Sequence, residues 1–389
     1  MILYMFIILM LLSLVSIVAA YRGRYPEKQI KWLFAVLVLA LAGIGARIEP
    51  KLTYDLYRHY QIIDRVRGSS YSLIDFLKEG YVITDINYKY TYIYNIFVFI
   101  IAKFFPNQAL PFFTICITYG SFGYILFREF RNKNVTNILF WEFRGKDLTN
   151  RNLVISISIF SVLMPYLYVY SNVRNALAGA IVAFGIYRLY KDRKILLFID
   201  CTVIAVLIHP IAAAIVPFIL LSRIKPGVKG IIVTLALPSL VFPLMEYFRL
   251  HLGNDYLFRI AAKYYNYTLV RQDNQGRVFL YSTVIMLIAL SILALWANRG
   301  NKTTWREKKY PLLNLIIWYS MFSLGYFRNY EMMTRLPYSI AFLSPVLVAT
   351  LFNPSEMKTK GAKLAYSGTA CVVFFLALLG FYENIAWLI

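Results

Sequence analysis

Cysteines, acidic side chains and the sequence motifs of familiar soluble catalysts are all scarce in this chain of 389 residues. Its 3 cysteines lie inside apolar stretches without the paired spacing of zinc ligands, which predicts neither a disulfide nor a zinc site. No glycine-rich phosphate loop, dinucleotide fingerprint or nucleophile elbow is present, which disfavours an ATP-driven pump. The early acids are spread along one segment, at Asp55, Asp64, Asp75 and Asp85. We therefore expect no cofactor and no metal ion, and we expect any group transfer to be metal-independent.

Apolar residues are what the chain has in abundance, because they make up 60% of its length. Runs of about 20 apolar residues recur from end to end, each long enough to cross a hydrocarbon core of about 30 Å. An open sheet is excluded at that depth because its backbone groups could not be satisfied. We therefore expect an all-α, polytopic integral membrane protein, a single helical transmembrane domain over residues 1–389 with about 11–13 transmembrane helices. The expected spans are residues 1–21, 32–47, 88–105, 108–128, 153–171, 175–190, 195–209, 211–222, 229–246, 278–297, 311–327, 336–352 and 364–381.

The basic residues, 41 against 19 acidic ones, decide the expected orientation of these spans. They gather in short loops between the apolar runs, which the positive-inside rule places in the cytoplasm. These loops are residues 128–151, 188–194, 222–229, 298–309 and 353–363. The excess of positive charge is therefore topological, and no nucleic-acid partner is expected. The amphipathic loop 48–87 and the basic and aromatic loop 247–277 are expected to be extracytoplasmic.

The front of the chain does not fit this alternation. The basic loop 22–31 is expected inside and the polar segment 48–87 outside. Two complete crossings at 88–105 and 108–128 would then return the chain to the wrong side. Either one of these two segments is re-entrant, or one early segment does not span the membrane.

The pattern of residues 51–67 predicts a short amphipathic helix with polar chemistry on one face. On a helix, Asp55 and His59 are i,i+4 neighbours, which places a carboxylate beside an imidazole. Tyr54, Tyr57 and Tyr60 lie alongside, and aromatic faces of this kind suit the stacking of sugar rings. The alternative is an interfacial helix whose charges pair with one another and whose tyrosines rest among the lipid headgroups.

Arg174 and His209 lie at the ends of apolar runs. A membrane-embedded arginine costs about 2.5–3.5 kcal/mol on insertion scales, and it usually faces a bundle interior or a wet cavity. The basic loops place both residues at the outer ends of their helices, where they could share one pocket. His209 is then a candidate general base, because the pKa of histidine lies near neutral pH. The alternatives are an arginine that snorkels to the membrane surface and a histidine that is satisfied locally.

A third polar group combines the loop 247–277 with Arg328 and Arg335. These two arginines flank a turn that the charge rule places outside, against the usual bias, and so they indicate an anionic ligand. Guanidinium groups match phosphate oxygens in a bidentate way. The alternative is pairing of both arginines with Glu331.

Four short motifs stand in a characteristic order: an aspartate–aromatic motif at 54–57, then NVRNALAGAI, LIHPIAAAI and EMMTRLPYSI. In this order the chain resembles the EpsG family of exopolysaccharide-biosynthesis membrane proteins, which are Wzy-like polysaccharide polymerases. In that family an aspartate–tyrosine motif, an Arg-Gln followed by small residues and a histidine that opens a helix recur in the same order. This chain departs from the pattern at three places: at Leu56, at Asn175 in place of the glutamine, and at Pro210 and Ile211 after the histidine.

The resemblance implies a GT-C-like helical bundle in the bacterial plasma (inner) membrane, with outward-facing loops and interfacial helices. It implies a glycosyltransferase that polymerises undecaprenyl-pyrophosphate-linked oligosaccharide repeat units for capsule or exopolysaccharide on the outer face. Asp55, His209 and Arg174 are then the expected catalytic residues, with His209 or Asp55 as the base and Arg174 stabilising phosphate charge. The expected substrate-binding residues are Arg335, Arg328, Tyr54, Tyr57, His59 and Asn175.

Two other functional classes are open to the same residues. A flippase or transporter of the lipid-linked oligosaccharide would use the same cations in a central cavity. A non-catalytic scaffold would use them to bind membrane lipid within a complex of other polysaccharide-assembly proteins.

Overall fold

The computed structural model is built almost entirely from helices. It describes residues 27–50, 55–79, 82–83, 86–87, 91–131, 156–157, 160, 163–164, 166–251, 277–299, 310–327 and 329–351. Within these residues the only sheet is a short antiparallel hairpin of β1 (Val82–Ile83) and β2 (Ile86–Asn87), in which Val82 faces Asn87 and Ile83 faces Ile86. The expected all-α class is therefore confirmed for the described part of the chain. The predicted spans 1–21 and 364–381, and most of the loop 247–277, lie outside the described residues.

Most of the longer helices coincide with the predicted apolar runs, because a long apolar run is buried most readily as a helix. In chain order they are α2 (Glu27–Arg47), α3 (Asp55–Arg67), α4 (Leu73–Glu79), α5 (Tyr92–Phe104), α6 (Ala109–Arg131), α8 (Tyr166–Ser171), α9 (Val173–Asp192), α10 (Ile195–Ile208), the 3-10 helix η1 (Pro210–Ile215), α11 (Val216–Leu221), α12 (Val228–His251), α14 (Arg277–Arg299), α15 (Tyr310–Leu324), α16 (Tyr330–Arg335), α17 (Tyr338–Ala341) and α18 (Ser344–Leu351). The predicted amphipathic helix is α3. The predicted span 336–352 is broken into α17 and α18.

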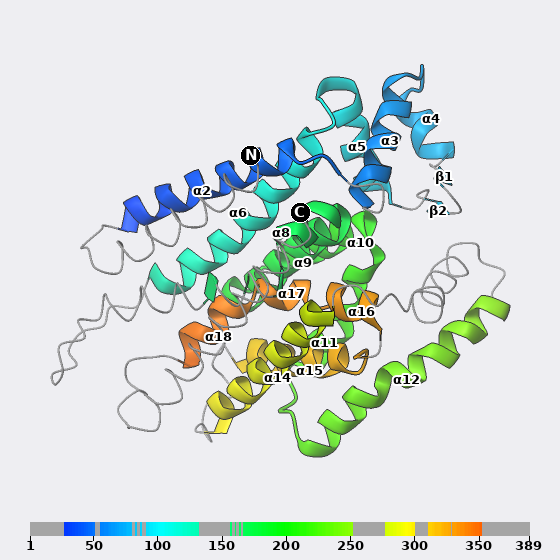
Figure 1. Cartoon of the computed structure of the whole chain (residues 1–389). Helices are drawn as coiled ribbons and strands as arrows, with labels where there is room; N and C mark the ends of the chain where they lie inside the picture. The colour runs from blue at the N-terminus through cyan, green and yellow to red at the C-terminus, as the bar shows by residue number, and fades with distance from the viewer. Residues whose placement is uncertain are drawn as a thin grey trace.

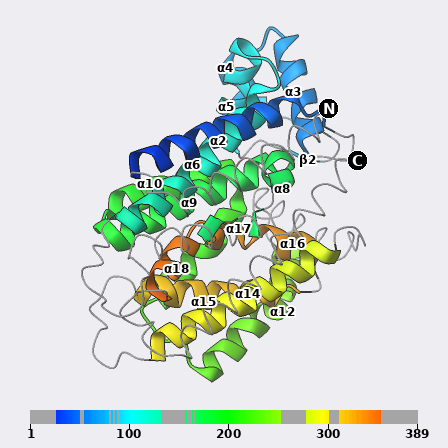
Figure 2. The same cartoon turned by 60° about the vertical axis from the view of Figure 1, so that its left-hand side comes forward.

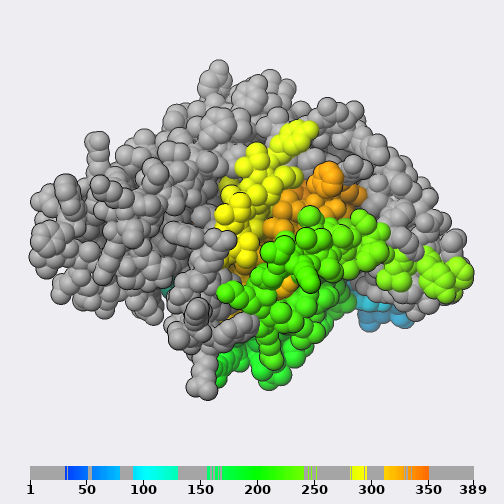
Figure 3. All heavy atoms as spheres, turned by 90° about the horizontal axis from the view of Figure 1, so that it is seen from below, coloured from blue at the N-terminus to red at the C-terminus, as the bar shows by residue number. Residues whose placement is uncertain are grey.

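The long helices form two layers, which Figure 2 shows one above the other. In the first layer α2 packs on α6, α6 on α9 and α9 on α10; in the second, α15 lies between α14 and α12. α17 contacts α9, and α18 contacts both α6 and α14, so these two short helices join the layers. Figure 3 shows α12 and α14 at the outer surface of the second layer.

α2 and α6 run antiparallel to each other. The ring of Phe34, near the start of α2, packs edge-on against Phe127, near the end of α6, with centroids 5.4 Å apart. The Lys31 ammonium lies 5.9 Å from the centre of the same Phe127 ring. The end of α2 and the start of α6 therefore lie at the same end of the bundle, and α3, α4 and α5 form a group beyond that end (Figure 1).

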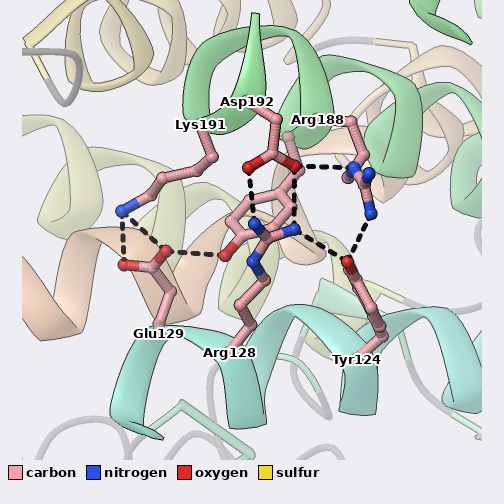
Figure 4. Close-up of polar contacts among 7 residues, drawn as sticks. Tyr124, Arg128, Glu129, Arg188, Lys191 and Asp192 are labelled. Carbon is pink, nitrogen blue, oxygen red and sulfur yellow. Dashed lines mark hydrogen bonds and ion pairs between the residues drawn. The ribbon is translucent and has the colours of Figure 1, made fainter. Parts of the chain in front are cut away.

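The opposite end of the bundle is tied together by a polar network between α6 and α9 (Figure 4). Its members are Tyr124, Arg128 and Glu129 of α6 and Tyr187, Arg188, Lys191 and Asp192 of α9. Arg128 Nη1 donates to Asp192 Oδ2 at 2.8 Å, and Lys191 Nζ lies 2.7 Å from Glu129 Oε1. Because the C-terminal ends of both helices meet here, α6 and α9 run parallel.

Two of the predicted cytoplasmic loops, 188–194 and 222–229, begin at this same end. The Tyr190 hydroxyl lies 2.6 Å from the Ser222 hydroxyl. Asn314 near the start of α15 donates to the Ser222 carbonyl at 2.9 Å, and Trp318 donates to the Ile224 carbonyl at 3.1 Å. These contacts group the loops as the charge pattern predicted. Which face of the membrane they occupy stays a prediction.

One helix in the described residues, Ala109–Glu129, is long and apolar enough to cross a membrane by length and composition. The apolar segments of the other helices in that part are 10–17 residues long, so the predicted number of spans stays a prediction. Several helices are nonetheless apolar on their exposed side, as Leu196 of α10, Ile232 of α12 and Ile292 of α14 are 78%, 60% and 59% exposed. A helix that is apolar all round is typical of a membrane or a large buried core.

Candidate functional site

α3 brings the predicted carboxylate and imidazole to one place because of its amphipathic pattern. The buried residues of α3 recur at helical spacing and face α5: they are Leu56, His59, Ile62, Ile63 and Val66. Asp55 opens the helix, where the helix dipole favours a negative charge. The predicted i,i+4 pair therefore joins His59 on the buried face of α3 to the partly exposed Asp55.

Asp55 lies between His59 and Arg174. Its Oδ2 atom is 3.4 Å from His59 Nε2 and 3.7 Å from Arg174 Nη2. The side chain of His59 is fully buried and that of Arg174 is 6% exposed, whereas that of Asp55 is 24% exposed. Asp55 is therefore the member of this trio that a ligand in solvent reaches first.

Tyr94 of α5 supports this trio from within the protein. It is 1% exposed, and the Arg174 guanidinium carbon lies 5.5 Å from the centre of its ring. The His59 ring meets the same ring at 63°, with centroids 5.1 Å apart. The attraction between a desolvated guanidinium and an aromatic face is worth about 2 kcal/mol. Tyr94 therefore fixes the positions of both His59 and Arg174 relative to Asp55.

Arg335 of α16 adds a second cation that acts on the Asp55 carboxyl. Burial on its own raises the pKa of Asp55, but His59, Arg174 and Arg335 outweigh it and hold that pKa well below its ordinary value of 3.8. Burial lowers the pKa of His59 below its ordinary value of 6.5, against the opposing effect of Asp55. At neutral pH the group therefore holds a carboxylate, a neutral imidazole and two guanidinium groups, with an excess of one positive charge.

Asn175 follows Arg174 on α9 and faces a different neighbour. It lies one turn before Gly179, where an added Cβ would be 3.1 Å from the Tyr338 Cβ of α17. Residues i and i+4 share a face of a helix, so Asn175 is directed toward the α16–α17 segment that carries Arg335. Its Oδ1 atom is buried and has no hydrogen-bond partner among the described residues. A buried amide oxygen of this kind can accept a hydrogen bond from a ligand O–H or N–H, because a buried acceptor that makes no hydrogen bond costs free energy.

The remaining predicted site residues are placed less centrally. His209 lies between α10 and η1. Its Nδ1 accepts a hydrogen bond from the Ile211 backbone N–H at 3.2 Å, so this nitrogen is occupied in capping η1. Tyr57 lies half-buried on α3. Tyr54 and Arg328 lie outside the described residues. The described residues hold no group of three or more His, Cys, Asp or Glu side chains that could bind a metal ion.

A comparison with protein families assigns the chain to a family. The model of one family matches residues 29–388, which is nearly the whole chain. The chain belongs to the EpsG family. Membership in the EpsG family indicates a membrane protein of exopolysaccharide biosynthesis. Comparisons with curated proteins and with solved structures found no match.

Tyr94 belongs to the candidate site but is not singled out by the sequence. It lies in the apolar and aromatic run 88–105, which was interpreted as a membrane span, and it is one of 32 tyrosines. The only available signal was the density of tyrosines itself. Nothing in the local pattern distinguishes a tyrosine that supports an arginine from one that fills a helix interface.

Proposed function

We propose that this EpsG-family protein polymerises lipid-linked oligosaccharide repeat units by metal-independent glycosyl transfer at the outer face of the bacterial plasma membrane. The observation that carries the proposal is the contact of Asp55 with both His59 and Arg174, with Arg335 acting on the same carboxyl. Family membership supports the substrate class, a saccharide carried on undecaprenyl pyrophosphate.

The transfer would move the growing chain from its pyrophosphate to a hydroxyl of the next repeat unit. The acceptor oxygen forms a bond to the anomeric carbon, the bond from that carbon to the pyrophosphate oxygen breaks, and its electron pair leaves with the pyrophosphate. Arg174 and Arg335 would stabilise the charge that develops on the leaving group. Donors fixed in advance at such a position are the largest single contribution in many group transfers.

Asp55 is the group that we propose takes the proton of the acceptor hydroxyl. His59 and the guanidinium groups of Arg174 and Arg335 hold its pKa low in the free protein, which makes it a weak base there. A bound pyrophosphate would offset those positive charges and so raise the pKa of Asp55. The base would thus gain strength only when the donor substrate is in place, while neutral His59 keeps the carboxylate oriented.

The sugar portion would be held by the polar and aromatic groups around this carboxylate. Asn175 Oδ1 offers an acceptor for a sugar hydroxyl or an acetamido N–H, and Tyr57 offers a ring for stacking. Tyr54 and Arg328 are proposed as further substrate contacts on the strength of the sequence motifs alone. His209 is the alternative to Asp55 as the general base.

A deletion strain tests this function against the flippase alternative. We expect loss of the gene to leave single lipid-linked repeats on the outer side of the membrane and to abolish long surface polymer. Complementation with the wild-type gene should restore polymer length, whereas Asp55→Asn at equal expression should not. Repeats trapped on the cytoplasmic side would instead identify a flippase, and unchanged polymer would exclude both functions.

A further inference from the structure

The segment between α2 and α6 begins and ends at the same end of the bundle. This follows from the antiparallel packing of α2 and α6, in which Phe34 meets Phe127. α5, the apolar helix in that segment, has 13 residues and so a length of about 20 Å, against a hydrocarbon core of about 30 Å. It packs on α3, on α4 and on α10, and only slightly on α6. A complete crossing of the membrane by α5 is therefore inconsistent with its length. It is also inconsistent with the end of α2 and the start of α6 lying at the same end of the bundle.

The C-terminal ends of α3 and α5 cap each other with basic side chains. Arg67 donates from Nε to the Ala102 carbonyl at 3.2 Å and from Nη2 to the Phe105 carbonyl at 2.8 Å. Lys103 Nζ donates to the carbonyls of Val66 at 3.1 Å and Ser69 at 3.0 Å. Carbonyls at both helix ends are thus paired within the protein, which suits a helix end placed near lipid.

Apolar side chains project around these cations. Phe104 is 75% exposed, and Ile100 and Phe105 are each 42% exposed. The C-terminal end of α5 therefore presents aromatic and aliphatic surface beside Lys103 and Arg67, the combination found where a protein lies in the headgroup region of a bilayer. We call these five residues the α5 tip.

The α5 tip continues the exposed stripe of α6, the one helix in the described residues that is long and apolar enough to cross a membrane. Phe105 packs edge-on against Phe113 of α6, with ring centroids 5.6 Å apart. One turn further along α6, Ile117 is 40% exposed. If α6 crosses the membrane, the lipid surface that covers Ile117 therefore extends to Phe113 and Phe105.

From these observations we infer that the α5 tip is a membrane anchor seated in the headgroup and acyl boundary of the outer leaflet, and that α5 does not cross the bilayer. The occupant of this surface is phospholipid. Lys103 favours anionic headgroups there, whereas the charge of Arg67 is offset by Asp64, whose Oδ1 lies 3.0 Å from Arg67 Nη1. The whole segment 48–108 then stays on the outer side, which removes the conflict in the predicted alternation of the early spans. α3 extends from this anchor to Asp55, so the anchor sets the depth of the candidate site relative to the membrane surface.

Cysteine labelling in intact cells tests whether α5 crosses. Gln108→Cys lies between α5 and α6, Lys78→Cys lies in the last turn of α4, and Lys194→Cys immediately precedes α10; all three positions are exposed. In a variant without the 3 native cysteines, a membrane-impermeant maleimide should label positions 108 and 78 equally, and position 194 only after permeabilisation. Labelling of position 108 together with position 194 would overturn the inference.

A nitroxide attached at Phe104→Cys tests the contact with lipid in the full chain reconstituted into vesicles of phosphatidylethanolamine and phosphatidylglycerol. We expect its ratio of collision rates with oxygen and with a water-soluble nickel complex to be several-fold higher than that of the matched label at Lys78→Cys. Equal ratios at the two positions would contradict the anchor. Both measurements are independent of catalysis, so they stand or fall separately from the proposed polymerase activity.

Discussion

Replacing Arg174 with glutamine removes one of the two cations that face Asp55. The substitution keeps a polar side chain of moderate length but loses the contact of 3.7 Å with Asp55 and the position over the Tyr94 ring. Loss of one preorganised donor to a developing charge costs about 10²–10³ in kcat, or about 2.7–4 kcal/mol. We expect Arg174→Gln to fall in this range, with a smaller change in KM. Arg174→Lys, which keeps the charge but not the planar fork, should lose about 10-fold, or 1.4 kcal/mol.

Arg188→Gln is the matched control, because it makes the same substitution on the same helix. Arg188 lies 14 residues beyond Arg174, about 21 Å away along α9, in the network with Asp192. The assay follows chain elongation of a lipid-linked repeat, extracted from a deletion strain, by purified protein in liposomes. Activity of Arg174→Gln within threefold of wild type, or a larger loss in Arg188→Gln, would refute the role assigned to Arg174.

Three further outcomes follow from the same structure. Tyr94→Phe keeps the ring under Arg174 and should retain activity, whereas Tyr94→Leu should lose about 10-fold in kcat; equal losses would show that the ring is not the support. Burial lowers the pKa of His59, so below pH 6.5 the unfolded chain binds a proton that the folded protein does not. The free energy of unfolding should therefore decline as pH falls below 6.5, and thermal unfolding of His59→Gln should lack this decline. Asp192→Asn removes the negative charge and one of the two oxygens that accept hydrogen bonds from Arg128. It should cost about 1 kcal/mol of stability with little loss of activity, which unfolding and elongation assays together would check.

The part of the site that follows from local spacing was predictable. Asp55 and His59 are four residues apart in an amphipathic segment, and helical periodicity makes such residues neighbours whatever the rest of the fold does. The contact of Asp55 with Arg174 depends on how α3 docks on the start of α9. No periodicity encodes that docking, so the two motifs could be joined only through the family resemblance. The role of Tyr94 was not predictable from the sequence, because it arises from two partners on other helices.

The helices were predictable from apolar runs, but their relation to the membrane was less so. The run 88–105 has the composition of a span, its helix α5 has 13 residues and packs on α3, α4 and α10, and whether it crosses the membrane stays a prediction. Composition alone does not separate a helix that faces lipid from one that is buried by protein, because both are apolar on every side. The β1–β2 hairpin was missed for a simpler reason: its strands have two residues each and leave no periodic pattern.

The central claim is that Asp55 and its cations carry out chain elongation. It is tested most directly by supplying purified protein in liposomes with lipid-linked repeat units and measuring polymer length, for wild type and for Asp55→Asn, which keeps the shape of the side chain. Wild type should convert single repeats into long polymer, and Asp55→Asn should leave them as single repeats although it binds them. Polymer of equal length from both proteins, or none from wild type, would contradict the account.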